Sequence, residues 1–327
     1  MRRFAAMSDP LVDPMMDGAI VDCLVVGGGP AGLTAALYLA RYHLDVLVLD
    51  AGDSRAALIP LSRNHAGYPE GITGTDLLAR MGQQAMLYGA QILPARVDAL
   101  AREDDGFIAT AGARHWRARS VLLATGVINN RPTMPKPLHD DALARGLIRY
   151  CPICDGYEVT DKRVGVIGTG DHGVREALFL RSYTADLALI APDGRHDLDP
   201  AQRHQLQDAG ILVVEGTTPV YEIAGGGITV GGRVYDSLYP ALGSQIRSEL
   251  AGPVGVEMAG GGCLAVDSHQ RTNVPGLYAA GDVVLGLDQI SHAMGEGGVA
   301  ATTMRNDLAK RQSLFRAVPE PVKAAAQ

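Results

Sequence analysis

Two segments of the chain share one pattern of apolar and polar positions. Residues 22–50, DCLVVGGGPAGLTAALYLARYHLDVLVLD, align without a gap with residues 163–191, RVGVIGTGDHGVREALFLRSYTADLALIA, 141 positions further along. Each segment begins with an apolar run typical of a buried parallel strand and passes through glycines into apolar residues at helical spacing. Each ends in a second apolar run. Both copies therefore predict a strand, a turn, an amphipathic helix and a strand.

Other apolar runs complete this pattern. RSVLLATGV at 119–127 predicts a strand between the copies, and Tyr239–Gly243 predicts another after the second copy. TNVPGLYAAGDVV at 272–284 predicts a strand that ends near Gly281, and the following segment predicts a helix that ends near Arg311. The chain therefore leaves one strand–turn–helix–strand unit, builds a second and returns. We expect an α/β protein with two Rossmann-like, three-layer domains, the second inserted into the first.

The predicted domain limits follow from this order. We expect a discontinuous first domain at 18–129 and 245–318, an inserted domain at 130–244, and flexible ends at 1–17 and 319–327. A chain of 327 residues exceeds what one core usually supports, which agrees with two domains.

Composition excludes several classes of protein. The chain has 29 basic and 36 acidic residues, a net charge of -7 that gives no general attraction to nucleic acid. No apolar run reaches the roughly 20 residues that a bilayer requires, and the N-terminus lacks the apolar core of a signal peptide. Four cysteines are too few for a disulfide scaffold, so we expect a reducing, cytoplasmic setting without a membrane.

The glycines of the first turn match the needs of a dinucleotide. The first permits a tight turn, the second lets a pyrophosphate approach the backbone, and the third lets helix and strand pack closely. The helix N-terminus donates N–H groups to the anion, and an acidic residue at the end of the second strand can accept from ribose hydroxyls. The predicted cofactor-binding residues of this turn are Gly27, Gly29, Pro30, Ala31, Gly32 and Asp50.

The second turn keeps its glycines and loses its acid. Its glycines are Gly168, Gly170 and Gly173, and Ala191 stands where the first copy has Asp50. Loss of the acid can admit the 2′-phosphate of NADPH, which also needs cations nearby. Such cations lie close along the chain, in Arg195, His196 and Arg203. The sequence predicts a dinucleotide-type fold here and leaves its ligand open.

A cysteine pair precedes the second nucleotide-type strand. Tetrahedral zinc needs four ligands, and we interpret the only other cysteines, Cys23 and Cys263, as structural. The spacing of Cys151 and Cys154 favours redox exchange, in which one thiolate attacks a partner disulfide and the other resolves it. Asp155 is placed to act as acid or base for a leaving thiolate, with a turn or capping role as the alternative.

Several motifs resemble one family in their order along the chain. They are GGGPAGLTAALYLAR, NHAGYPEGITG, LLATGV, CPICDGYE, the second GxGxxG and YAAGDVV with LDQISHAMGEGGVAA. Together they span about Asp22 to Arg311 and resemble the low-molecular-weight thioredoxin reductases. The resemblance implies FAD in the first domain, NADPH and the redox-active cysteines in the inserted one, a thioredoxin-like or small disulfide substrate, and a homodimer.

The resemblance also implies roles for particular residues. Cys154 would face the flavin and Cys151 would attack the partner, with a rotation of the inserted domain about linkers near Asn130 and Gly243 between the two steps. The further residues that it implies at FAD are Asn64, Thr125, Gly126, Gly281, Asp282, Gln289 and Ile290. The last two would lie at the positive end of a helix, which stabilises a reduced, anionic flavin.

Two departures from the family keep alternatives open. The second strand is followed by Ala191-Pro192-Asp193 where the family has a His-Arg-Arg run, and the redox motif reads CPICDG where CATCDG is common. One alternative is a related flavoprotein with ferredoxin or another donor, or a dithiol oxidase that uses oxygen. A second is a flavin and thiol sensor without turnover. His292 and His65 are candidate bases, although a hydrogen-bonded structural histidine is the commoner case.

Overall fold

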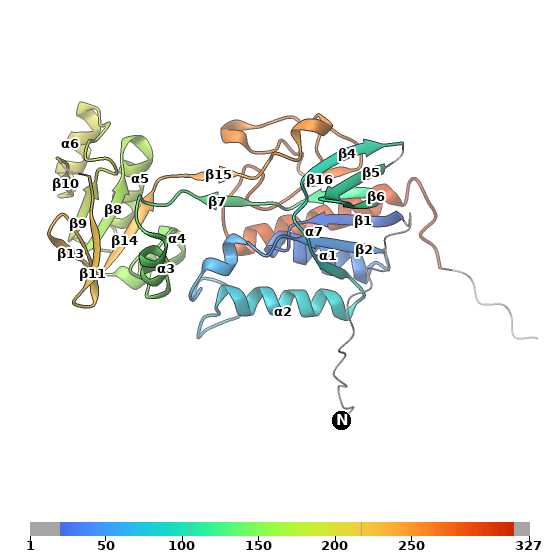
Figure 1. Cartoon of the computed structure of the whole chain (residues 1–327), viewed down its shortest axis with the longest axis horizontal. Helices are drawn as coiled ribbons and strands as arrows, with labels where there is room; N and C mark the ends of the chain where they lie inside the picture. The colour runs from blue at the N-terminus through green and yellow to red at the C-terminus, as the bar shows by residue number, and fades with distance from the viewer. Residues whose placement is uncertain (1–19, 105, 217, 317–327) are drawn as a thin grey trace, which may run out of the picture.

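The computed structural model describes residues 20–104, 106–216 and 218–316, and two lobes follow one another along its long axis (Figure 1). The expected flexible ends, 1–17 and 319–327, lie outside the described residues. Within the described residues, no helix has both the length and the apolar character needed to cross a bilayer.

The larger lobe is built on a seven-stranded sheet. Its strand order is β3-β2-β1-β6-β5-β4, and β16 also pairs with β6. The strands are β1 (Ile20–Val26), β2 (Val46–Asp50), β3 (Gln91–Pro94), β4 (Ala99–Glu103), β5 (Gly106–Ala111), β6 (Arg114–Leu123) and β16 (Leu277–Ala279). The returning strand β16 pairs with the end of β6, whereas the start of β6 forms an antiparallel hairpin with β5. The chain thus re-enters the first sheet, as the sequence predicted.

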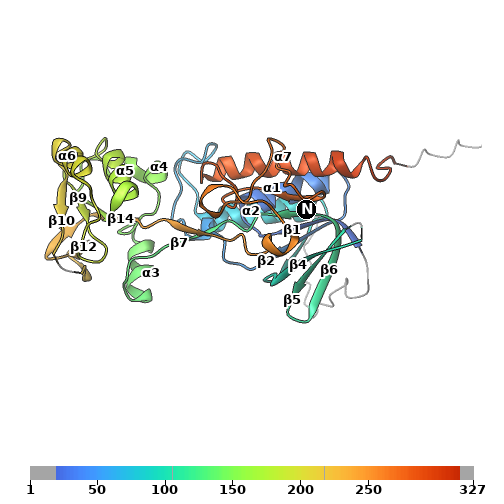
Figure 2. The ribbon, with the colours of Figure 1, turned by 90° about the horizontal axis from the view of Figure 1, so that it is seen from above.

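Helices of this lobe pack closely because small residues face one another. The elements are α1 (Pro30–Arg41), η1 (Arg55–Leu58), α2 (Gly74–Leu87) and α7 (Ile290–Leu308), and short turns η3 (Gly252–Val254) and η4 (Gly260–Gly262) precede α7. A side chain at Gly297 of α7 would overlap the carbonyl of Ala31, so the two helices meet backbone to backbone. Helices α1 and α7 lie side by side in this lobe (Figure 2). The end of β1 and the starts of α1 and α7 line one cavity.

The smaller lobe contains the second copy of the strand, turn, helix and strand pattern, in a smaller sheet. Its parallel sheet has the order β10-β9-β8-β14, formed by β8 (Val164–Gly168), β9 (Leu187–Ile190), β10 (Leu212–Val214) and β14 (Ser237–Ala241). A three-stranded sheet, β11 (Tyr221–Ala224), β12 (Gly227–Val230) and β13 (Arg233–Tyr235), packs beside it. The helical elements are α3 (Lys136–Ala144), α4 (Pro152–Asp155), η2 (Gly156–Val159), α5 (Gly170–Leu180) and α6 (Pro200–Asp208).

The two sheets share strand register as well as order. Cys23 of β1 pairs with Val46, and Val164 of β8 pairs with Leu187, each 141 positions further along. A gapless repeat in the sequence therefore corresponds to equivalent strand pairing in space.

Two extended segments join the lobes. They are β7 (Val127–Asn129) and β15 (Ser244–Ile246), which pair antiparallel (Figure 1). Asn130 fixes the end of this ribbon, because its backbone N–H donates to the carbonyl of Gly243 at 3.0 Å and its side-chain amide donates to Leu242. The expected limit at 129/130 falls at the end of β7 and the one at 244/245 falls within β15, and both stay predictions.

Candidate functional site

One cavity of about 470 Å³ extends from the first glycine turn to the disulfide. Every residue that the sequence implied for the first nucleotide site lines it, apart from the close-packing Gly32: Gly27, Gly29, Pro30, Ala31, Asp50, Asn64, Thr125, Gly126, Gly281, Asp282, Gln289 and Ile290. Cys151, Cys154 and Asp155 line the same cavity from the smaller lobe. The tertiary structure thus brings the two predicted groups of residues to one place.

The first glycine turn requires glycine at two positions for steric reasons. Gly27 has φ +111°, and a side chain there would overlap the carbonyl of Ala124. A side chain at Gly32 would overlap the carbonyl of Gly27. The turn therefore stays open for an anion at the N-terminus of α1.

Asp50 fixes this turn from the end of β2. Its Oδ1 accepts a hydrogen bond from the backbone N–H of Gly28 at 3.0 Å. A side chain at Gly28 would overlap the Asp50 carboxylate. The turn, its helix N-terminus and this acid together fit the adenosine diphosphate half of FAD.

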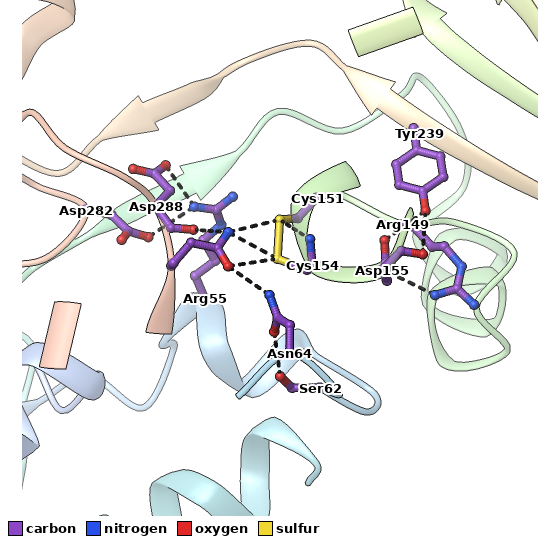
Figure 3. The surroundings of a disulfide bond; sticks show 11 residues. Arg55, Ser62, Asn64, Arg149, Cys151, Cys154, Asp155, Tyr239, Asp282 and Asp288 are labelled. Carbon is purple, nitrogen blue, oxygen red and sulfur yellow. Dashed lines mark hydrogen bonds and ion pairs between the residues drawn. A yellow bond between two sulfur atoms is a disulfide. The ribbon is translucent and has the colours of Figure 1, made fainter. Parts of the chain in front are cut away.

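Arg55 provides a cation that the sequence reasoning missed. Its Nη1 donates to Asp282 at 3.0 Å and to Asp288 at 2.9 Å (Figure 3). Burial raises the pKa of Asp282, and Asp288 adds to this effect, whereas Arg55 opposes it. No local signal could have identified Arg55, because its partner Asp282 lies 227 positions further along.

Cys151 and Cys154 form a disulfide around the first turn of α4. Cys151 is the N-terminal cap of this short helix, and Pro152 follows at its first position. Gln289, at the N-terminal end of α7, points its amide nitrogen to both sulfurs at 3.3 Å. Asn64 in turn donates to the Gln289 amide oxygen at 3.0 Å. The disulfide therefore contacts the start of α7, where the family resemblance implied the flavin.

Asp155 follows the disulfide and carries two hydrogen bonds. The Tyr239 hydroxyl donates to Oδ1 at 2.8 Å, and Arg149 Nη1 donates to Oδ2 at 2.9 Å (Figure 3). Burial raises the pKa of Asp155, and Arg149 and Tyr239 oppose this rise. The sequence named Asp155 and missed both of its partners, which come from other segments of the inserted lobe.

The second glycine turn keeps its backbone packing. A side chain at Gly173 would lie 2.8 Å from the carbonyl carbon of Gly168, and Gly170 has φ +57°. These features fit a dinucleotide diphosphate at the N-terminus of α5. None of these three glycines lines the cavity that holds the disulfide.

Side chains close the second turn differently from the first. Thr169, which stands where the first turn has Gly28, accepts a hydrogen bond from Asp197 N–H at 2.6 Å. Ala191 is buried directly after β9, so no carboxylate takes the position of Asp50. Among the nearby cations, Arg203 pairs with Glu215 at 3.2 Å, while Arg195 is exposed and makes no hydrogen bond or ion pair with another described residue. Arg195 is therefore the cation available for a 2′-phosphate.

The remaining candidates do not line the cavity that holds the disulfide. His292 pairs with Glu296 one turn along α7 at 3.0 Å, and His65 shares a hydrogen bond with Ser291 at 3.2 Å. Both therefore have structural partners. Cys23 and Cys263 are buried free thiols, and burial raises the pKa of Cys23 to about 12. The described residues contain no cluster of three or more His, Cys, Asp or Glu side chains that could hold a metal.

Comparison with known proteins gives consistent matches over most of the chain. The family described as pyridine nucleotide-disulphide oxidoreductase matches residues 21–297. Thioredoxin reductase of Treponema pallidum is 32% identical over 298 residues, which cover 86% of this chain and 94% of that protein. Thioredoxin reductase of Streptomyces coelicolor is 32% identical over 318 residues, with 91% and 97% covered.

Solved structures agree with the fold and differ in how well the whole chain superposes. The crystal structure of HlmI has a TM-score of 0.81 at 29% identity, covering 90% of this chain and 94% of that one. Lactococcus lactis thioredoxin reductase in its FR conformation covers 89% and 99% at 25% identity, yet its TM-score is 0.58.

Proposed function

We propose one function for this chain, which belongs to the pyridine nucleotide-disulphide oxidoreductase family and, within it, to the low-molecular-weight thioredoxin reductases. It is an FAD-dependent disulfide oxidoreductase that passes electrons from NADPH through the Cys151–Cys154 disulfide to a thioredoxin-like protein. The observation that carries this function is the disulfide itself, which lies in the cavity of the first nucleotide site and contacts Gln289 at the start of α7.

Different residues of the large lobe are proposed to bind different parts of FAD. The N–H groups at the start of α1 face the diphosphate, and Asp50 accepts from the adenosine ribose. Asp282 accepts from the ribityl chain, while Asn64, Gln289 and Ile290 position the ring beside the disulfide. FAD bound there would supply two-electron chemistry between a reduced nicotinamide and a disulfide.

The cysteines are proposed to have separate tasks. Cys154 faces the flavin, and Cys151 attacks the partner disulfide. In the present arrangement both sulfurs contact Gln289, so a protein substrate needs the pair to leave this position. Rotation about the β7–β15 ribbon would expose it. The lower TM-score of the Lactococcus lactis structure, 0.58 against 0.81 for HlmI at similar coverage of this chain, supports different lobe arrangements among relatives.

NADPH is proposed to bind at the second glycine turn. Gly168, Gly170 and Gly173 provide the diphosphate cradle, and Arg195 is the available cation for the 2′-phosphate. The partner is proposed to be a thioredoxin-like protein or a small disulfide. A homodimer in the cytoplasm is our further expectation.

Anaerobic titration of the flavin-loaded protein tests this function. NADPH is expected to bleach the flavin absorbance at micromolar concentrations, with NADH less effective, and the reduced protein is expected to reduce thioredoxin. Bleaching by dithionite or a dithiol but by neither nucleotide would contradict NADPH as donor and favour a dithiol oxidase or another electron donor. Reduction of the flavin without transfer to any disulfide would instead indicate a sensor.

Replacing Arg55 is expected to weaken FAD binding. In Arg55→Gln, Asp282 and Asp288 lose their shared cation and face the cofactor with uncompensated negative charge. We expect a loss of affinity of about tenfold or more, as for one lost charge-assisted hydrogen bond. Fluorescence titration of the apoprotein with FAD measures this change. Arg80→Gln removes an exposed charge on α2 and is expected to bind FAD as the wild type does. Equal affinities for both variants would contradict the assignment.

A further inference from the structure

The side-chain amide of Gln289 is held in one orientation beside the disulfide. Asn64 Nδ2 donates to the amide oxygen at 3.0 Å, and the amide nitrogen donates to the carbonyl of Asp288 at 3.0 Å. Asn64 is itself oriented, because its Oδ1 accepts from the hydroxyl of the buried Ser62 at 3.1 Å (Figure 3). The amide nitrogen of Gln289 is therefore kept at 3.3 Å from both sulfurs of the disulfide.

The two sulfurs differ in their other hydrogen-bond donors. The backbone N–H of Cys154 donates to Cys151 Sγ at 3.2 Å, within the first turn of α4. For Cys154 Sγ, the described residues supply no donor other than the Gln289 amide. Cys151 therefore has a donor within the inserted lobe, whereas Cys154 depends on a residue of the large lobe.

The Gln289 amide favours a thiolate over a thiol at Cys154. An N–H group that donates to a charged sulfur makes a charge-assisted hydrogen bond, and such bonds are about twice as strong as neutral ones. The amide oxygen is the weaker partner for a thiol, because it lies 3.7 Å from Cys154 Sγ and already accepts from Asn64, and because S–H is a weak donor. Gln289 therefore acts mainly on the ionised form of Cys154.

We propose that the side-chain amide of Gln289 stabilises the thiolate of Cys154 in the reduced pair, and that Asn64 is a positioning residue that keeps the amide nitrogen at the sulfur. This inference rests on the proposed function and deepens it, because it gives both side chains a task at the sulfurs besides the binding of FAD. Gln289 touches the reacting atoms, whereas Asn64 acts on them through Gln289.

The negative charge is then expected to change sulfur when the inserted lobe rotates. Breaking the disulfide with the two electrons that the proposed function supplies, and with one proton from solvent, leaves one thiol and one thiolate. While the pair contacts the large lobe, Gln289 stabilises the charge on Cys154. After rotation Cys154 has lost this donor and Cys151 keeps its own, so the proton passes from Cys151 to Cys154. The sulfur proposed to attack the partner is thereby ionised.

Three groups of ion-paired side chains border this cavity and act on any thiolate within it. They join Arg55 to Asp282 and Asp288, Arg63 to Glu158, and Arg149 to Asp155. His65, next to Asn64, shares a hydrogen bond with Ser291. The variants that test the inference leave all of these groups unchanged, so they report on the amide.

Alkylation of a single thiol as a function of pH tests the role of Gln289. In Cys151→Ser, Cys154 is the remaining thiol of the pair. The flavin-loaded protein is treated with iodoacetamide at a series of pH values, and mass spectrometry follows the peptide that contains Cys154. Adding Gln289→Leu is expected to move the midpoint of this profile to higher pH by about one unit, the size expected for one hydrogen bond to a charged group. In Cys154→Ser, the same substitution is expected to move the profile of Cys151 less, because Cys151 keeps its backbone donor.

A double-variant cycle tests the positioning role of Asn64. Asn64→Leu in the Cys151→Ser protein is expected to move the midpoint for Cys154 in the same direction by a smaller amount. Because Asn64 acts through Gln289, both substitutions together are expected to give no larger shift than Gln289→Leu alone. Gln84→Leu, at an exposed glutamine of α2, is the matched control and is expected to leave the profile unchanged.

The possible outcomes separate the parts of the inference. An unchanged or lowered midpoint in Gln289→Leu overturns it, and an equal shift for both sulfurs overturns the difference between them. Additive shifts refute the positioning role of Asn64. If Gln289→Leu does not fold, Asn64→Leu decides the question, because the inference requires it to raise the midpoint for Cys154 as well. Failure of the wild-type dithiol to reduce any disulfide would instead refute the proposed function and would leave these shifts unaffected.

Discussion

The Cys154→Ser protein is expected to bind FAD and to be bleached by NADPH, yet to lose disulfide reduction. Cys154 closes the disulfide with Cys151, and a serine cannot form or resolve that bond. The FAD-binding residues of the large lobe are unchanged, so flavin content and its reduction should persist. We expect multiple-turnover reduction of thioredoxin to fall by about a thousandfold or more, since exchange requires a resolving thiolate.

The measurement compares the bleaching of the flavin by NADPH with the rate of NADPH oxidation coupled to the reduction of thioredoxin. Cys263→Ala provides the matched control, because Cys263 is a free cysteine in the large lobe without a disulfide partner. It should turn over at the wild-type rate. If Cys154→Ser reduced thioredoxin as fast as the control, the pair would not be the exchange centre.

The Gly32→Val protein is expected to be purified with little or no flavin. A side chain at Gly32 overlaps the carbonyl of Gly27 and would lie 3.1 Å from Val25, so the turn between β1 and α1 must open. Opening this turn displaces the N–H groups that face the diphosphate. The expected flavin content is below about a tenth of the wild-type value, the effect of a few lost hydrogen bonds to a charged group.

Flavin absorbance after denaturation, divided by protein concentration, measures this content. Gly295→Ala is the matched control, because Gly295 is an exposed glycine of α7 with no atom near the added carbon. It should retain full flavin and equal or greater thermal stability. Wild-type flavin content in Gly32→Val would contradict the assigned role of this turn.

The first nucleotide unit could be predicted from sequence almost completely. Its strand, turn and helix depend on local chemistry, such as the apolar run that ends at Gly27 and the Pro at the first helical position. The repeat also predicted equivalent strand register in the two sheets, because the same number of residues separates the two paired strands in each copy. The antiparallel β4 and β5 hairpin was not assigned, and the segment of β11–β13 was expected only as short strands with glycine turns, without its pairing, since short strands carry weak periodic signals.

The sequence could not predict the contacts between distant segments. Gln289 reaches Cys151 from 138 positions away, and Tyr239 reaches Asp155 from 84. Any of 29 basic residues could have balanced the acids of the site, and only packing selects Arg55 and Arg149. His292 was a candidate base because of its position in the α7 segment, yet in the structure it pairs with Glu296.

By itself the sequence determined two nucleotide-type units, the exchange-competent cysteine pair and the acid that follows it, because each depends on residues close together in the chain. The tertiary structure alone decided how these parts meet. In the folded chain the disulfide contacts Gln289, Arg55 forms an ion pair with Asp282, and Asp155 binds both Arg149 and Tyr239. These contacts depend on how the returning helix α7 packs against α1 and on how the β7–β15 ribbon orients the two lobes, and neither is encoded in local spacing.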